Sequence, residues 1–168
     1  MTNLDGPRLA TPNDAPALVD LINRAFRIER SFKNGDRTDL TQVHEKLATG
    51  SFFVIEDQGE LVGCIYTEVA QSGNPHTLAS GEGAGYIGML AIDPGQQGRG
   101  LGRQLMLFAE AELARRGCTR VQIRIINVRS ELYDFYGRMG YRETGTTPYP
   151  APERVSRPIH FVNLEKGI

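Results

Sequence analysis

The sequence predicts an α/β domain with a mixed, largely antiparallel sheet of about seven strands. Short apolar segments of strand length alternate along the chain with longer segments whose apolar residues recur at helical spacing. Two of the short segments, residues 52–55 and 61–66, flank a tight turn and predict an antiparallel hairpin. At 168 residues and 40% hydrophobic content, the chain suits one domain covering residues 1–168.

The first 50 residues predict a short strand and two helices. The strand covers residues 8–10, and Thr11 and Pro12 then supply an N-cap and a proline at the first helical position. The first helix has its apolar residues at helical spacing, namely Leu18, Leu21, Ile22, Ala25 and Phe26. A polar, glycine-broken segment, residues 27–39, leads into a second helix that stops at Gly50.

The remaining elements follow the hairpin. Residues 71–83 are rich in Gly, Ser, Asn and Pro and predict a loop, after which residues 85–92 predict a strand. The later elements alternate helix and strand: helices over residues 100–116 and 130–139, and strands over residues 121–126, 141–144 and 159–164. The proline-rich residues 147–158 join the last two strands.

Composition disfavours several classes of protein. The formal net charge is -1 and charges of both signs are interspersed, so we expect no nucleic-acid or anionic-membrane partner. No stretch approaches the ~20 apolar residues that cross a bilayer, and the N-terminus lacks a signal core, so we expect a cytoplasmic protein. Cys64 and Cys118 are too few for a disulfide framework or a CxxC metal site, and we expect two buried thiols and no metal.

The run from Ile87 to Arg103 has the order of a backbone anion site: an apolar strand, a glycine-rich turn and a helix. Glycines let the backbone approach a phosphate, and the unpaired N–H groups at the helix start point toward it. Gly100 is followed by Leu-Gly-Arg, which excludes a Walker A loop. A dinucleotide fingerprint starting at Gly98 would need a glycine at position 103 and an acidic residue near the end of the next strand, and both are missing.

Two motifs carry a resemblance to a known family. Gln97-x-x-Gly100-x-Gly102, after a strand ending in Leu-Ala-Ile-Asp-Pro, resembles the acetyl-CoA pyrophosphate loop of the GCN5-related N-acetyltransferase (GNAT) family. The segment from Leu132 to Gly145 is similar to the family's second signature, a helix carrying a tyrosine followed by Gly-Tyr and a strand. The resemblance implies the GNAT fold, a mixed, mostly antiparallel seven-stranded sheet with about four helices packed on both faces.

The resemblance implies acetyl-CoA as co-substrate and transfer of its acetyl group to a primary amine by direct attack on the thioester. The pantetheine arm would lie between two splayed central strands, against the backbone of Leu90, Ala91 and Ile92. Other cofactor contacts would come from the loop, the helix start and the end of the next strand: Gln97, Gly98, Arg99, Gly100, Leu101, Gly102, Arg103, Asn127 and Arg129. Many members have an asparagine seven residues before the tyrosine, where this chain has Arg129.

The resemblance makes the Tyr136 hydroxyl the proton donor to the CoA thiolate. A tyrosine with an ordinary pKa of about 10 is protonated at pH 7 and can donate. The alternative is a tyrosine that only packs the helix onto the sheet, and Tyr133 is then the second candidate donor.

The general base is not fixed by either motif. Glu82, just before the central strand, is the expected base. The other candidates are Glu68, His76, His160 and a chain of bound water. Tyr86 is expected to line the acceptor pocket.

The acceptor is expected between the first helices and residues 147–158. That region has apolar and basic members: Phe26, Phe32, Tyr149, Pro150, Arg27, Arg30, Lys33 and Arg154. A small-molecule amine that also has a carboxylate would fit. A protein lysine or N-terminus is an alternative acceptor, favoured by an open groove, and a catalytically silent acetyl-CoA sensor is an alternative function. The family resemblance leaves a homodimer open.

Overall fold

One seven-stranded sheet organises the computed structural model, which describes residues 4–72, 74 and 77–168. The strand order is β1-β2-β3-β4-β5-β7-β6, and every neighbouring pair is antiparallel except β4 and β5. The strands are β1 Arg8–Leu9, β2 Ser51–Asp57, β3 Glu60–Val69, β4 Ala84–Ile92, β5 Arg120–Ile126, β6 Arg142–Pro148 and β7 His160–Gly167.

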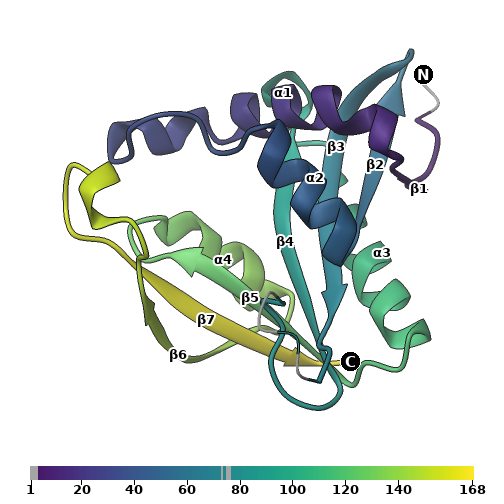
Figure 1. Ribbon diagram of the computed structural model, residues 1–168. Coiled ribbons are helices and arrows are strands. Elements are labelled where there is room, and N and C mark those ends of the chain that lie inside the picture. Colours follow the sequence, from purple (N-terminus) through teal and green to yellow (C-terminus); the bar gives the residue numbers. More distant parts are fainter. Residues whose placement is uncertain (1–3, 73, 75–76) are drawn as a thin grey trace.

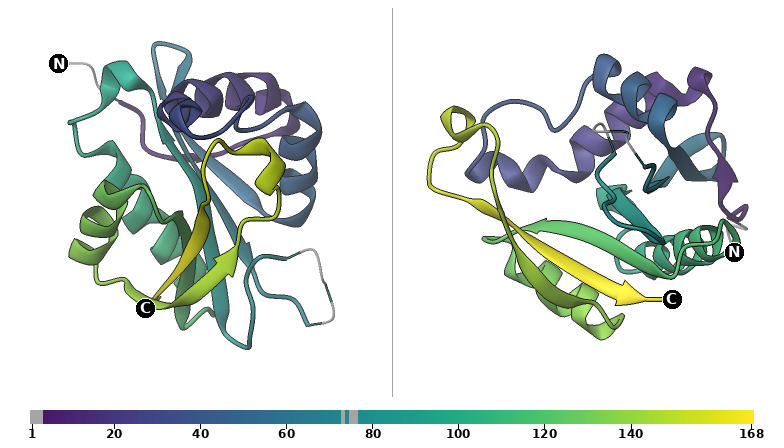
Figure 2. Two further views of the ribbon diagram at one scale, coloured as in Figure 1. Left: turned by 90° about the vertical axis from the view of Figure 1, so that its left-hand side faces the viewer. Right: turned by 60° about the horizontal axis from the view of Figure 1, so that its bottom comes forward.

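Four α-helices cover the two faces of the sheet (Figures 1 and 2). They are α1 Ala15–Ala25, α2 Leu40–Thr49, α3 Leu101–Arg115 and α4 Ser130–Arg138. Helices α1 and α2 bury Leu18, Leu21 and Val43 in one core cluster, whereas α3 and α4 bury Leu105 and Tyr136 in a second. The predicted fold class is therefore confirmed.

Local sequence accounts for the ends of several elements. The Asp39 side chain accepts a hydrogen bond from the Gln42 N–H at 2.9 Å and so caps α2. A Cβ on Gly50, which ends that helix, would lie 2.3 Å from the carbonyl oxygen of Thr67, so only glycine fits there. At the predicted hairpin turn, Gln58 and Gly59 both adopt positive φ.

The structure adds short 3₁₀ turns where the sequence predicted helix or irregular chain. They are η1 Pro12–Asp14, η2 Arg27–Ser31, η3 Pro94–Gln96 and η4 Pro152–Arg154. The capping box at Thr11 and Asp14 therefore starts a 3₁₀ turn, and the α-helix begins at Ala15. Element η2 matters most for the site, because it fixes which side chains of the predicted polar segment face inward.

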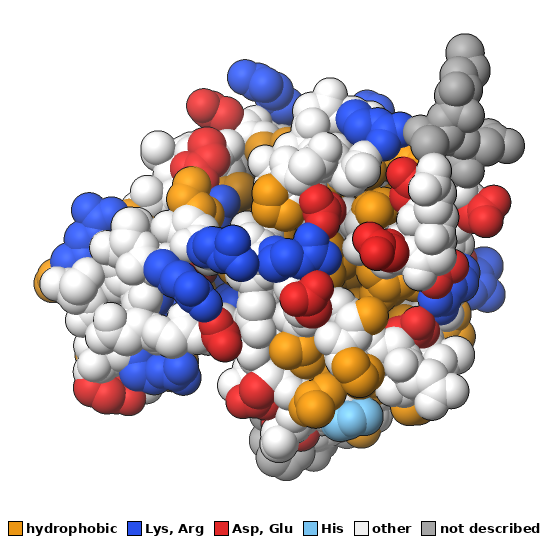
Figure 3. Space-filling model, turned by 90° about the horizontal axis from the view of Figure 1, so that it is seen from above, with side chains coloured by type: hydrophobic (Ala, Val, Ile, Leu, Met, Phe, Trp, Pro, Cys, Tyr) orange, Lys and Arg blue, Asp and Glu red, His pale blue; other side chains and the backbone are white. Residues whose placement is uncertain are grey.

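The surface carries both signs of charge. On the face seen in Figure 3, Lys and Arg side chains lie among Asp and Glu side chains. Within the described part of the chain, none of the helices has the length and apolar character needed to cross a membrane.

Candidate active site

The central strands β4 and β5 are paired at one end only. Parallel pairing joins Ala84–Tyr86 to Arg120–Gln122, and beyond Tyr86 the strands diverge (Figure 1). A cavity of about 640 Å³ lies in the opening. Residues 87–92 of β4 have no strand partner on the β5 side among the described residues. The backbone groups of that edge are therefore available to a ligand.

A β-bulge shapes the same stretch of β4. Cys64 pairs with Ala91 and Tyr66 pairs with Gly88, so two residues of β4 oppose one residue of β3. Met89, inside the bulge, adopts a φ of 49°. A bulge interrupts the ladder and re-aims side chains locally. Both bulged residues, Met89 and Leu90, line the cavity.

The glycine-rich loop precedes α3 and has an open surface. Gly98 and Gly100 have φ values of 82° and 77°, and no atom lies within 4 Å of a Cβ built on either. Glycine is required there by backbone conformation, and the space outside the loop is empty of protein. The first helical hydrogen bond runs from the Gln104 N–H to the Gly100 carbonyl at 3.0 Å. The preceding amides, of residues 101–103, are left for a ligand.

The start of this loop is tied to α1. The Asp93 carboxylate accepts a hydrogen bond from the Gly95 N–H at 2.8 Å and forms an ion pair with Arg24. These contacts fix where the loop leaves the strand. The predicted strand, turn and helix are therefore present in the order that an anion site needs.

The cavity has two ends, and the loop end lies against the glycine-rich turn. It is lined by Leu90, Ile92, Gln97, Gly102, Leu132 and Phe135. These residues are close together, because a Cβ on Gly102 would lie 3.7–3.9 Å from atoms of Phe135, Ile92 and Leu90. The loop end is largely apolar, with the amides of residues 101–103 at its margin.

All of the expected cofactor residues except Asn127 fall into three groups. Leu90, Ile92, Gln97, Gly102 and Arg129 line the cavity. Gly98, Arg99, Gly100 and Arg103 are exposed in the loop and the first turn of α3. Leu101 and Ala91 are buried, and their side chains belong to the core clusters on opposite faces of the sheet.

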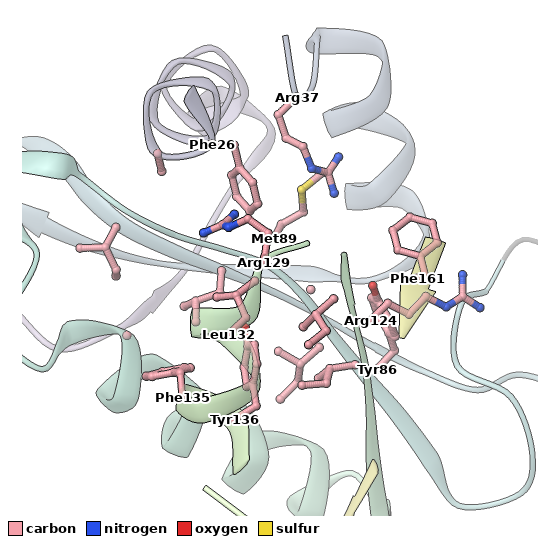
Figure 4. A pocket seen from close by; sticks show the side chains of 18 of the residues that line it. Phe26, Arg37, Tyr86, Met89, Arg124, Arg129, Leu132, Phe135, Tyr136 and Phe161 are labelled. Atoms are coloured by element: carbon pink, nitrogen blue, oxygen red, sulfur yellow. The ribbon is translucent and has the colours of Figure 1, made fainter. Parts of the chain in front are cut away.

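Asn127 and Arg129 have different surroundings. The Asn127 side chain accepts a hydrogen bond from the His160 N–H at 2.9 Å, which extends the β5–β7 ladder, and it does not line the cavity. Arg129 lines the cavity, and its guanidinium pairs with the carboxylate of Glu131 at 2.6 Å and with that of Glu29 at 3.7 Å. Figure 4 shows Arg129 extending toward Phe26 of the opposite wall. Arg129 is therefore the better placed of the two for contact with a ligand.

Tyr136 of α4 lies in the cavity wall, as Figure 4 shows. Its ring packs edge-to-face against Phe135 and Tyr141, with centroid distances of 5.0 and 5.8 Å. Its hydroxyl has no hydrogen-bond partner among the described residues. Burial, with a smaller contribution from Tyr86, raises the pKa of Tyr136. The hydroxyl therefore keeps its proton at neutral pH. Tyr133 does not line the cavity.

The arginine end of the cavity lies on the side of α1 and α2. Its lining consists of Phe26, Arg37, Lys46, Tyr86, Arg124, Pro150 and Phe161. Phe26, Tyr86 and Pro150 were predicted here. The predicted basic residues of the region do not line the cavity: Arg27, Arg30, Lys33 and Arg154. The 3₁₀ geometry of η2 leaves Arg27 and Arg30 exposed, and the Lys33 ammonium pairs with Glu29 at 3.4 Å.

Two chain segments that lie close in sequence to the lining residues Arg37 and Pro150 pair with each other. The Asn34 N–H donates to the Arg154 carbonyl at 2.8 Å, and the Ser156 N–H donates to the Phe32 carbonyl at 2.9 Å. They form an antiparallel bridge, which consists of residues 32–34 and 154–156. The two segments also meet in the ribbon views of Figures 1 and 2.

The base candidates are not brought to the cavity. Glu82 is exposed in the turn before β4, at the end where β4 and β5 are still paired. Glu68 is buried and its carboxylate accepts hydrogen bonds from the Tyr66 hydroxyl and the Ala79 N–H. His160 is exposed at the start of β7, and His76 lies outside the described residues. The carboxylate that does line the cavity, Glu131, is paired with Arg129.

Both cysteines are buried, as expected. Burial raises the pKa of the Cys64 thiol to about 12. Its Sγ donates weakly to the Met89 carbonyl at 3.4 Å. The thiol therefore stays protonated and serves the packing beneath the bulge.

Comparison with known proteins identifies the family. The profile of the acetyltransferase (GNAT) family matches residues 15–141. A mycothiol acetyltransferase from Cellulomonas flavigena is 29% identical over 113 residues, which are 67% of this chain and 32% of that protein. The chain thus spans about a third of the length of this curated relative.

Solved structures share the fold. Ribosomal-protein-alanine N-acetyltransferase from Brucella melitensis superposes with a TM-score of 0.75 at 20% identity, covering 96% of this chain and 99% of that one. The protein yncA from Salmonella typhimurium, solved with its cofactor acetyl-CoA, has a TM-score of 0.73 at 18% identity, covering 98% and 93% of the two chains. With its splayed central strands, its glycine-rich loop and the matching profile, the chain belongs to the acetyltransferase (GNAT) family.

Proposed function

We propose that this chain transfers the acetyl group of acetyl-CoA to the primary amine of a small molecule, by direct attack of the amine on the thioester. The observation that carries the proposal is the cavity between β4 and β5, which joins an apolar loop end to a basic arginine end. Such a cavity can receive two substrates from opposite ends and hold their reacting atoms between them.

The loop end fits acetyl-CoA. The open surface outside Gly98 and Gly100 and the free amides at the start of α3 suit a pyrophosphate. The unpaired edge of β4 and the apolar side chains of Leu90 and Phe135 suit the pantetheine arm. Acetyl-CoA, when bound, supplies the activated acetyl thioester. The free N–H groups of the β4 edge are donors for its carbonyl oxygen.

Tyr136 supplies the proton in this proposal. It lines the cavity and its hydroxyl is unbonded to any described residue. Because burial raises its pKa, the hydroxyl is protonated when the leaving thiolate needs a proton. Tyr133 does not line the cavity and is not needed.

The amine proton has no fixed acceptor in this proposal. Glu82 was the predicted base, and its exposed position outside the cavity lining lends that role no support. Glu68 already accepts hydrogen bonds on both carboxylate oxygens. We therefore propose that water takes the proton, so that the reaction uses the fraction of amine that is neutral.

The shape of the arginine end favours a small acceptor over a protein. The arginine end belongs to a cavity of about 640 Å³ that is lined from both walls, whereas a lysine on a folded protein would need an open groove. The name of the curated relatives, mycothiol acetyltransferase, also supports a small-molecule acceptor. The ribosomal-protein-alanine N-acetyltransferase is only 20% identical and shares only the fold, so it does not support the hypothesis of a protein acceptor.

The test is CoA release, followed with a thiol reagent, when purified protein and acetyl-CoA meet amino acids, polyamines, amino sugars or short peptides. We expect release that depends on the amine and that favours small molecules over peptides. Preference for peptides would contradict the small-molecule acceptor. Acetyl-CoA binding measured by calorimetry, with no release by any amine, would favour the sensor function, and the absence of binding would contradict both.

A further inference from the structure

Two half-buried arginines, Arg37 and Arg124, line the arginine end of the cavity without an anionic partner. Neither guanidinium forms an ion pair or hydrogen bond with any residue that the structure describes. We propose that the acceptor amine also carries an anionic group, a carboxylate or a phosphate, and that Arg37 and Arg124 bind it. This inference rests on the proposed acetyltransferase function and names the class of its acceptor.

Arg37 enters the cavity from the segment between η2 and α2. Its guanidinium lies over the ring of Phe26, 5.3 Å from the centroid. Figure 4 shows it reaching in from the side of α1 and α2. Burial and, next, the charge of Arg37 lower the pKa of Lys46, which lines the same end of the cavity. The Lys46 ammonium is thus close enough for the charge of Arg37 to act on it.

Arg124 enters from the opposite wall, on β5. It pairs with Asn163 of β7 in the sheet, and its neighbours Ile123 and Ile125 are buried in the core cluster beneath. Burial raises the pKa of the Tyr86 hydroxyl, and the charges of Arg124 and Arg37 both oppose that rise. The charges of the two guanidiniums therefore act on one hydroxyl from two walls of the cavity.

Among the described residues, none of the carboxylates forms an ion pair or hydrogen bond with Arg37 or Arg124. Other partly buried arginines are paired: Arg24 with Asp93, and Arg129 with Glu131. The charge of the buried Glu68 also acts on Lys46 and Tyr86, but its carboxylate bonds to the Tyr66 hydroxyl and to backbone N–H groups and contacts neither guanidinium. A desolvated cation without a counter-charge costs free energy, and a bound anion removes that cost. Guanidiniums also match the planar or tetrahedral oxygens of carboxylate and phosphate.

Matched amines test the inference. The pairs are L-amino acids against their α-amides, and O-phosphoethanolamine against ethanolamine. An amide lowers the basicity of the neighbouring amine and leaves more of it neutral, so a preference for the acid cannot come from amine basicity. We expect the anionic member of at least one pair to have the higher kcat/KM, by about tenfold or more. The pair that shows the preference identifies the anion.

Variants place the recognition on the two arginines. Arg37→Gln and Arg124→Gln should each raise the KM of the anionic amine by about tenfold to hundredfold and leave that of its neutral partner nearly unchanged. The KM for acetyl-CoA should stay within about twofold, which reports an intact fold. Arg116→Gln, an exposed arginine just after α3, removes the same charge outside the cavity and serves as the control.

Two results separate this inference from the proposed function. Equal kcat/KM within both pairs, or variants that weaken neutral and anionic amines alike, would overturn the anionic acceptor while leaving the acetyltransferase intact. If no amine gives CoA release, the same pairs are compared by their effect on the unfolding temperature of the CoA-bound protein. Stabilisation by the anionic members that is lost in Arg124→Gln supports the inference even then, and equal stabilisation overturns it.

Discussion

The ring of Tyr86 covers Gly88, two residues further along β4. A Cβ on Gly88 would lie 2.7 Å from Cε1 of Tyr86 and 3.0 Å from its hydroxyl oxygen. Both residues line the cavity. The absence of a side chain at position 88 therefore lets the tyrosine lie against the strand in the cavity wall.

Gly88→Ala is expected to push the Tyr86 ring into the cavity. The ring is buried, so it cannot move without displacing its neighbours or narrowing the space for the acceptor. We expect kcat/KM for the amine to fall by about tenfold, with a smaller change in the KM for acetyl-CoA. Gly145→Ala is the control, since a Cβ there meets no atom within 4 Å. Equal activity of the two variants would contradict the role of Gly88.

Gly100→Asp is expected to abolish acetyl-CoA binding. It places a negative charge at the N-terminus of α3, where the pyrophosphate is proposed to lie. Gly100→Asn is the matched control, because asparagine tolerates a φ of 77° about as well as aspartate and has the same shape without the charge. Calorimetry should show at least about tenfold weaker binding in the aspartate variant than in the asparagine variant. Equal affinities would place the pyrophosphate elsewhere.

Tyr136→Phe is expected to keep acetyl-CoA binding and lose turnover. The substitution removes only the hydroxyl and retains the edge-to-face packing with Phe135 and Tyr141. Loss of a general acid lowers kcat by at least about a hundredfold. Tyr133→Phe is the control, since that residue lies outside the cavity lining. If kcat in Tyr136→Phe equals the unsubstituted rate, Tyr136 only packs.

The pH profile should reflect the raised pKa of Tyr136. A general acid works in its protonated form, so activity is present below its pKa and is lost as the pH rises through it. Because burial raises the pKa of Tyr136 above the ordinary value of about 10, activity should persist through pH 9.5. A steady-state profile between pH 7 and pH 9.5 with a fall centred below pH 9 would contradict this assignment.

The loop end could be predicted from the sequence because its residues are contiguous. Gln97 and Gly102 lie within one strand, turn and helix, and the helical and glycine signals of that segment are local. The start of the opening could not be predicted. It depends on where pairing of β4 with β5 stops, after Tyr86, and β5 follows the whole of α3. The same dependence on strand pairing explains why Glu82 lies outside the cavity lining. Glu82 comes just before β4, at the end where β4 and β5 are still paired.

The arginine end was predicted only in part because three distant segments build it. Phe26 and Pro150 were expected there, but Arg37, Lys46 and Arg124 were not. One signal for Arg124 was available: it interrupts the apolar strand Val121–Ile126 on the same face as Gln122, which indicates a face that is not core. No comparable signal marks Arg37, because its direction depends on how η2 meets α2.

Glu68 is expected to fasten a loop and not to act as the base. Its Oε1 accepts N–H groups of Leu78 and Ala79, and its Oε2 accepts the Tyr66 hydroxyl at 2.8 Å. Glu68→Gln keeps the shape and can still accept from the loop amides, so kcat should stay within about threefold, whereas loss of a general base would lower it by at least about a hundredfold. Glu68→Ala leaves buried donors unsatisfied and should lower the free energy of unfolding by about 1–3 kcal/mol. Urea unfolding measures that loss. A collapse of kcat in Glu68→Gln with unchanged unfolding would instead make Glu68 the base.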